Sequence, residues 1–144
     1  MQSRNLVEVL VVEDNPGDAS LLQEVLGSAK VITHVHHIED GAEALAYLRR
    51  EGTHADAPLP HLMFLDLSLP GMDGRKLLDA VKEDPRLKAM PVVVLTSSHT
   101  DHDVRQCLER HANCFVTKPE RTEEFGALAR TVVRFWLEVV TLPR

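Results

Sequence analysis

Four short apolar runs, each meeting a polar residue where it ends, constrain the fold of this chain more than any other feature. Each run is apolar on consecutive positions and rich in branched side chains, a pattern typical of a β-strand covered on both faces. The runs are VLVVED at 9–14, LMFLDL at 62–67, PVVVLTSS at 91–98 and CFVTKP at 114–119. A fifth candidate, VITHVHHI at 31–38, is less apolar and is predicted to be an edge strand.

Helical patterns separate these runs. Apolar residues recur at helical spacing in each interval, after a residue suited to start a helix. The predicted helices begin after Asn15, Asp40, Asp73, Ser98 or Thr100, and near Thr122. Strict alternation of strand and helix predicts an α/β fold, a doubly wound parallel sheet with helices on both faces. The segment 51–61 is predicted to be a surface loop.

Length and composition favour one domain, residues 1–144. The chain is 44% hydrophobic and 26% charged, close to the averages of globular proteins. Its net charge of -6 and the lack of a dense basic run argue against nucleic acid or an anionic membrane as the main partner. No apolar run could span a bilayer and no signal peptide is evident, so a cytoplasmic location is expected. Cys107 and Cys114 are expected to be reduced thiols.

The polar residues that end the four runs are expected to meet at one edge of the sheet, where such folds bind ligands. These residues are Glu13, Asp14, Asp66, Thr96 and Lys118. Clustered carboxylates repel each other unless cations intervene, and Mg2+ prefers oxygen ligands. A metal, a lysine and a hydroxyl around a central aspartate suit a phosphoryl group. Asp66 is therefore the candidate nucleophile.

The segments VLVVEDNPGD, LMFLDLSLPGMDG, VVVLTSS and CFVTKP resemble the four signatures of the receiver domain of two-component response regulators. The resemblance implies a flavodoxin-like fold whose five parallel strands lie in the order 2-1-3-4-5. It implies that Asp66 accepts a phosphoryl group from a phosphohistidine on a sensor histidine kinase. It also implies a Mg2+ ion held by Glu13, Asp14, Asp66 and the backbone carbonyl of Ser68, with Glu13, in place of the family's more frequent aspartate, reaching the ion through a water.

The same resemblance implies a switch formed by Thr96, whose hydroxyl turns toward the phosphate, and Phe115, which then rotates inward. Lys118 would pair with a phosphoryl oxygen, and its peptide bond to Pro119 would be cis, as is common in this fold. The family implies a signalling protein rather than an enzyme with an external substrate, although it catalyses its own phosphotransfer and dephosphorylation. Ser68 and Ser98 occupy the positions that tune dephosphorylation in receivers.

The end of the chain suggests how the signal leaves the domain. We expect an extended helix and a tail over about 120–144, and no DNA-binding output domain. The segments EDNPGD, LDLSLPGMDGR, HANCFVTKP and FWLEVVTLP are similar to stand-alone regulators that partner bacterial and cyanobacterial phytochromes. That similarity implies a bacteriophytochrome kinase as partner and a homodimer formed through the last strand and helices. The interface candidates are Phe135, Trp136 and Val140, although a core position for Trp136 is equally consistent with the sequence.

Other functions remain open at this point. Phosphatases of the haloacid dehalogenase type also use an aspartate, a Thr or Ser, a lysine and Mg2+. Their nucleophile, however, stands on the first strand and has an acid two residues later, where this chain has Ser68. A receiver-like binding module that takes no phosphate is a third possibility. Two histidine pairs, 34 with 36 and 99 with 102, formally allow a transition-metal site but lack an evident third ligand.

Overall fold

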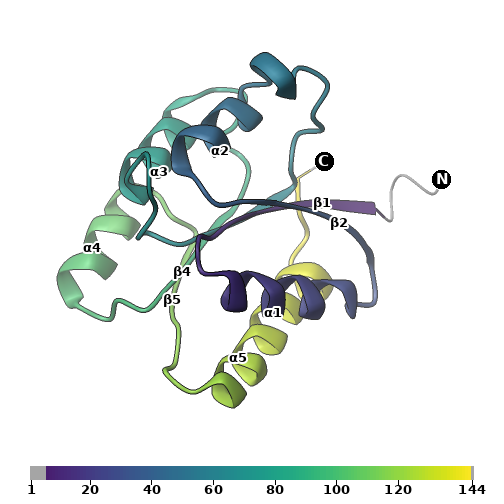
Figure 1. Cartoon of the computed structure of the whole chain (residues 1–144), viewed down its shortest axis with the longest axis vertical. Coiled ribbons are helices and arrows are strands. Elements are labelled where there is room, and N and C mark those ends of the chain that lie inside the picture. The colour runs from purple at the N-terminus through teal and green to yellow at the C-terminus, as the bar shows by residue number, and fades with distance from the viewer. Residues whose placement is uncertain (1–5, 144) are drawn as a thin grey trace.

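The computed structural model describes residues 6–143, and its centre is one parallel sheet (Figure 1). The five strands lie in the order β2-β1-β3-β4-β5, and every neighbouring pair is parallel. Their bounds are β1 Leu6–Val12, β2 Ile32–Ile38, β3 Leu62–Leu65, β4 Val92–Thr96 and β5 Cys114–Thr117. The predicted fold and strand order are confirmed. Ile32 on β2 is 65% exposed, as expected for an edge strand.

Helices connect the strands, and a side-chain cap begins four of them. The bounds are α1 Pro16–Gly27, α2 Gly41–Leu48, α3 Gly74–Glu83, α4 Asp101–Glu109 and α5 Thr122–Arg134. The capping side chains, which accept a hydrogen bond from a backbone N–H of the first turn, belong to Asn15, Asp40, Asp73 and Thr100. Thr100 rather than Ser98 therefore caps α4. The predicted loop 51–61 contains a short 3-10 turn at Gly52–His54.

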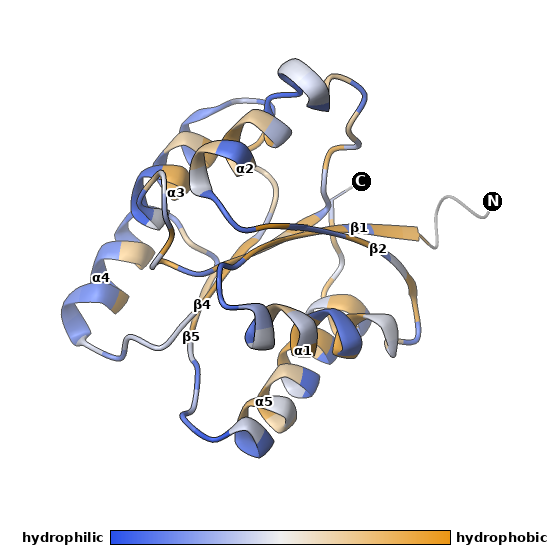
Figure 2. Ribbon diagram, in the orientation of Figure 1, coloured by the Kyte–Doolittle hydropathy of each residue, from blue (hydrophilic) through white to orange (hydrophobic). Residues whose placement is uncertain are grey.

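Two apolar layers cover the sheet, one on each face (Figure 1). Helices α1 and α5 pack on one face, whereas α2, α3 and α4 pack on the other. On β1, Val9 and Val11 face the first layer, while Leu10 and Val12 face the second. The central strands β3 and β4 are buried at every position and are hydrophobic along nearly their whole length (Figure 2), because both of their faces are covered. No helix in the described part of the chain is both long and apolar enough to cross a membrane.

The C-terminal region differs from one extended helix. Helix α5 ends at Arg134 and is followed by a π-helical turn, η3, over Phe135–Val139. Trp136 is only 8% exposed and belongs to the layer of α1 and α5, where it continues the buried row of Ala129, Val132 and Val133 at helical spacing. Phe135 is 50% exposed, and Val140 packs at the margin of the same layer. Of the three interface candidates, Phe135 is therefore the one that presents a large exposed side chain.

Candidate functional site

The residues predicted to meet at the strand ends lie together in the structure. Backbone hydrogen bonds extend the sheet past the last strand residues and hold these positions. The Asp66 N–H donates to the Val12 carbonyl at 3.0 Å, and the Lys118 N–H donates to the Thr96 carbonyl at 2.7 Å. Asp66 thus follows β3 beside the end of β1, and Lys118 follows β5 beside the end of β4. The site is built from strand ends on a rigid sheet.

The ammonium group of Lys118 lies at the centre of this site. Its Nζ atom is 2.6 Å from Glu13 Oε1, 2.8 Å from Asp66 Oδ2 and 2.8 Å from Asp18 Oδ2. Each contact engages one of the three N–H donors of the ammonium. The side chain is only 7% exposed. Burial would lower the pKa of Lys118, but the hydrogen bonds that its ammonium donates to these carboxylates outweigh burial and raise the pKa above its usual value.

The Lys118–Pro119 peptide bond is trans, so the prediction of a cis bond is wrong. Within the described residues every peptide bond is trans. The trans form is intrinsically preferred for bonds that precede proline. The lysine side chain nevertheless reaches all its carboxylate partners, because its backbone is already held by the Thr96 carbonyl.

The carboxylate of Asp66 is held from both sides. Its Oδ2 atom binds Lys118, and its Oδ1 atom accepts hydrogen bonds from Thr96 Oγ1 at 3.0 Å and from the Ser68 N–H at 3.1 Å. Burial alone would raise the pKa of Asp66. The hydrogen bonds from Lys118 and Ser68 more than offset it, so the pKa lies below its usual value. Asp66 is therefore an ionised, oriented carboxylate, which is the state a nucleophile requires.

Glu13 is the second buried acid. Its Oε1 atom binds Lys118, and its Oε2 atom accepts a hydrogen bond from the Asn15 N–H at 3.1 Å. Burial raises its pKa to about 7 despite Lys118, and the neighbouring charge of Asp66 adds to the rise. Two acids that share one lysine therefore differ in proton affinity. The pKa of Asp66 is lowered and that of Glu13 is raised, so Asp66 keeps its negative charge at a lower pH than Glu13 does.

The acidic group can hold a metal ion. Glu13, Asp14 and Asp66 each offer a carboxylate oxygen, and the three oxygens lie within 4.8 Å of one another. Asp14 is exposed, so the group opens to solvent on its side. Such a set of carboxylate oxygens with access to water suits a hard divalent cation such as Mg2+ or Mn2+. The donor set therefore fits the ion that the sequence implies.

Within residues 6–143, the acidic group above is the only cluster of three or more potential metal ligands, and no histidine belongs to it. His34 Nδ1 instead lies 2.6 Å from Glu8 Oε1. The ring of His36 stacks on Tyr47, with centroids 4.3 Å apart. The histidine pairs are thus accounted for by a hydrogen bond, by stacking or by solvent exposure.

Two contacts of the site were not predicted from the sequence. Asp18, in the first turn of α1, binds Lys118, and His37 Nε2 lies 2.7 Å from the Glu13 carbonyl oxygen. A carboxylate in a first helical turn is already explained by the helix dipole, so its position in EDNPGD indicated no further role. His37 was visible only as one of several histidines on β2. Their contacts depend on how α1 and β2 lie against the strand ends.

The loop after β4 is tied to helices α3 and α4. Ser98 Oγ donates to the Asp103 carboxylate, which also accepts from the Arg75 guanidinium. The side chain of Ser98 is thereby held by α4. Phe115, on β5, is half-buried and packs against the layer formed by α2, α3 and α4.

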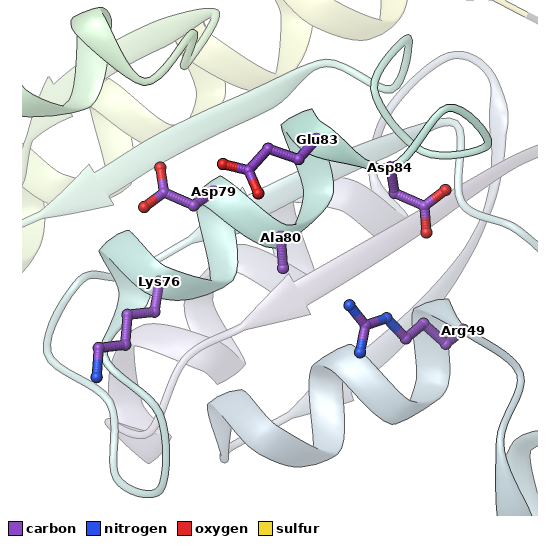
Figure 3. A pocket seen from close by; sticks show the side chains of 6 residues that line it. All are labelled: Arg49, Lys76, Asp79, Ala80, Glu83 and Asp84. Carbon is purple, nitrogen blue, oxygen red and sulfur yellow. The ribbon is translucent and has the colours of Figure 1, made fainter.

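A surface hollow lies apart from the acidic group. Its volume is about 460 Å³, and it is formed by the end of α2 and one side of α3 (Figure 3). The lining residues are Arg49, Lys76, Asp79, Ala80, Glu83 and Asp84. Charges of both signs line it, and none of the strand-end residues contributes to it.

A doubly wound parallel sheet that brings an acidic group, a threonine and a lysine to its carboxyl edge defines the receiver class of signalling domains. This chain belongs to the response regulator receiver domain family, whose profile matches residues 9–130. The match covers most of the chain, and the predicted family is confirmed. Membership in this family sets aside the haloacid dehalogenase alternative.

Relatives match over nearly their whole length. Response regulator Rcp1 of Synechocystis sp. is 42% identical over 135 residues, covering 94% of this chain and 92% of Rcp1. A crystal structure of the Mn2+-bound form of Rcp1 superposes with a TM-score of 0.94 at 40% identity, covering 96% of this chain and 99% of that one. The phosphorylated cyanobacterial phytochrome response regulator RcpA gives a TM-score of 0.93 at 41% identity, with the same coverage.

Proposed function

We propose that this protein is a single-domain response regulator, residues 1–144, whose Asp66 accepts a phosphoryl group from a sensor histidine kinase. The observation that carries the proposal is the environment of Asp66, an ionised carboxylate held by Lys118, Thr96 and the Ser68 N–H beside two further acids. That Mn2+-bound Rcp1 and phosphorylated RcpA share this fold supports both the metal and the phosphoryl group.

The residues divide the chemistry between them. Glu13, Asp14, Asp66 and the Ser68 carbonyl would hold Mg2+, which supplies positive charge against the oxygens of the transferring group. A carboxylate oxygen of Asp66 forms a bond to phosphorus, while the P–N bond of the phosphohistidine breaks and its electron pair returns to the imidazole nitrogen. Lys118 neutralises a phosphoryl oxygen. Hydrolysis by water, with cleavage of the bond between Asp66 and phosphorus, would reset the protein.

Thr96 and Phe115 would carry the change to the surface. The Thr96 hydroxyl, which now donates to Asp66, would turn to a phosphoryl oxygen once Asp66 is modified. Movement of the β4–α4 loop would leave room for the half-buried Phe115 to rotate inward beside α4. Phosphorylation would thus bias the surface of the last strand and helices between two arrangements.

The partners follow from the relatives. RcpA is a phytochrome response regulator, so we propose that a bacteriophytochrome is the kinase and that the protein acts in the cytoplasm. We propose a homodimer that uses the last strand and helices, where Phe135 exposes half of its side chain. Sedimentation that shows a monomer at micromolar concentrations, both with and without beryllofluoride as a phosphoryl mimic, would contradict the dimer.

Phosphorylation tests the chemistry directly. The wild-type protein and Asp66→Asn are incubated with phosphoramidate and Mg2+, and acid-labile phosphate is measured by intact mass. We expect one phosphoryl group on the wild type and none on the variant. Equal labelling of the two proteins would reject Asp66 as acceptor. If the wild type takes no phosphate and does not bind beryllofluoride with Mg2+, the protein is a receiver-like binding module instead.

If the wild type is labelled, phosphotransfer profiling against the host's histidine kinases would identify the kinase.

A further inference from the structure

We propose that Asp18 is a positioning residue for phosphoryl transfer, which keeps the ammonium of Lys118 directed into the site while the other carboxylates bind metal and phosphoryl group. The inference rests on the function proposed above. Its starting observation is that Asp18 Oδ2 lies 2.8 Å from Lys118 Nζ, the same distance as Asp66 Oδ2. A residue of helix α1 thus shares the lysine that the strand ends bring to the site.

Asp18 differs from the other two partners of Lys118 in what else it can bind. Glu13 and Asp66 both belong to the group of carboxylates that can hold a metal ion, and Asp18 does not. With a bound cation, Glu13 and Asp66 would share their oxygens between it and the ammonium, so both would hold Lys118 less strongly. Asp18 is then the carboxylate that still faces Lys118. It leaves the other donors of the ammonium free to point toward Asp66.

The position of Asp18 is suited to this role because α1 is rigidly held. The Asn15 side chain accepts a hydrogen bond from the Asp18 N–H at 3.0 Å, which places Asp18 in the first capped turn. Ala19 and Leu22 beside it are buried against the sheet. The Asp18 side chain is 28% exposed, so it is partly screened but remains close enough to bind the buried lysine directly.

The simpler alternative is that Asp18 only stabilises the positive, N-terminal end of the α1 dipole. That explanation predicts a small loss of stability and no special link to Lys118. The geometry predicts a link, because the Asp18 carboxylate reaches across from α1 to a residue that follows β5. A double-mutant cycle separates the two explanations, since residues that act through one contact are not additive.

The experiment compares Asp18→Asn with Glu24→Gln, a matched loss of one charge at an exposed position of the same helix. Rates of labelling by phosphoramidate in saturating Mg2+ are measured for both, and again for Asp18→Asn in a Lys118→Ala background. We expect Asp18→Asn to lower the rate about tenfold, the scale of one charge-assisted hydrogen bond. Glu24→Gln should match the wild type, and Asp18→Asn should have no further effect once Lys118 is removed.

Two readouts do not depend on turnover. Calorimetric titration should give Asp18→Asn a Mg2+ affinity within about twofold of wild type, as expected for a residue outside the metal group. The NMR signal of the Lys118 ammonium, which burial and hydrogen bonding protect from exchange, should broaden in Asp18→Asn and return in Asp18→Glu.

Two results would overturn the inference while leaving the proposed function intact. One is an Asp18→Asn protein that is labelled at the wild-type rate. The other is an equal loss of rate with and without Lys118, which would show that Asp18 acts by another route. A wild type that takes no phosphate would instead overturn the proposed function, and with it any role of Asp18 in transfer.

Discussion

Replacing Lys118 by methionine tests how the acidic site is held together. Met removes the charge and keeps a similar side-chain volume. The change leaves Glu13, Asp66 and Asp18 without their shared cation. Charge-assisted hydrogen bonds contribute about 1.5–3 kcal/mol each, so a simple sum over the lost contacts would be large. Because Glu13 has a pKa of about 7 and can take up a proton, and Asp18 is partly solvated, we expect the smaller loss typical of a broken buried pair, about 3–5 kcal/mol.

The free energy of unfolding is measured by urea denaturation, followed by the fluorescence of Trp136, which is the single tryptophan and is buried. In EDTA the variant should unfold at a clearly lower urea concentration than the wild type. Mg2+ should recover part of the loss, because a divalent cation neutralises the same carboxylates. The wild type should gain less from Mg2+, since Lys118 already neutralises them. Lys76→Met, at an exposed position on α3, is the control and should change stability by less than about 0.5 kcal/mol.

Two outcomes would refute this reasoning. A loss below about 1 kcal/mol in EDTA would place Lys118 among ordinary surface ion pairs. Equal stabilisation of both proteins by Mg2+ would show that the lysine and the metal ion do not share the same carboxylates. Either result would also remove the basis for treating Lys118 as the centre of the site.

Three further tests address the surrounding structure. Gly74→Ala should lower stability by about 1–3 kcal/mol in urea denaturation, because the added methyl would lie 2.7 Å from the Leu67 Cα atom; an unchanged urea midpoint would contradict this close approach. Trp136→Ala should cost about 3–5 kcal/mol, measured by circular dichroism, whereas Phe135→Ala, at a half-exposed position, should cost far less; similar losses would mean that the C-terminal turn packs differently. Asp40→Ala removes the N-cap of α2 and should cost about 1 kcal/mol of thermal stability, and an unchanged melting temperature would argue against the cap.

Much of the fold follows from local pattern. Runs such as VVVL could be assigned to buried strands because side chains covered on both faces must be apolar at every position. The helix starts at Asn15 and Asp40 could be predicted from the sequence, because capping depends on one side chain and the few residues after it. The alternation of the two element types then predicted a parallel sheet. The strand order came from the family resemblance rather than from these patterns.

The end of the chain shows where local pattern fails. FWLEVV has apolar residues on nearly every side, so its sequence could not separate core from surface. Trp136 is buried because it continues the helical spacing of Ala129 and Val132, which pack toward the sheet, whereas Phe135 lies beside that row and is half exposed. The trans bond before Pro119 is a similar case, because both isomers are accessible to a proline and the choice depends on the surrounding contacts.

The acidic site divides in the same way. The amino-acid types at the strand ends were sufficient to predict that Glu13, Asp66 and Lys118 meet, since parallel strands bring their carboxyl ends to one edge. The partners that come from elsewhere in the fold, Asp18 and His37, could be found only in three dimensions. Their contacts depend on the angle at which a helix and an edge strand pack against the sheet, and no short-range pattern encodes that angle. The sequence was therefore sufficient to predict the chemistry of the site, whereas packing decided which carboxylates share Lys118.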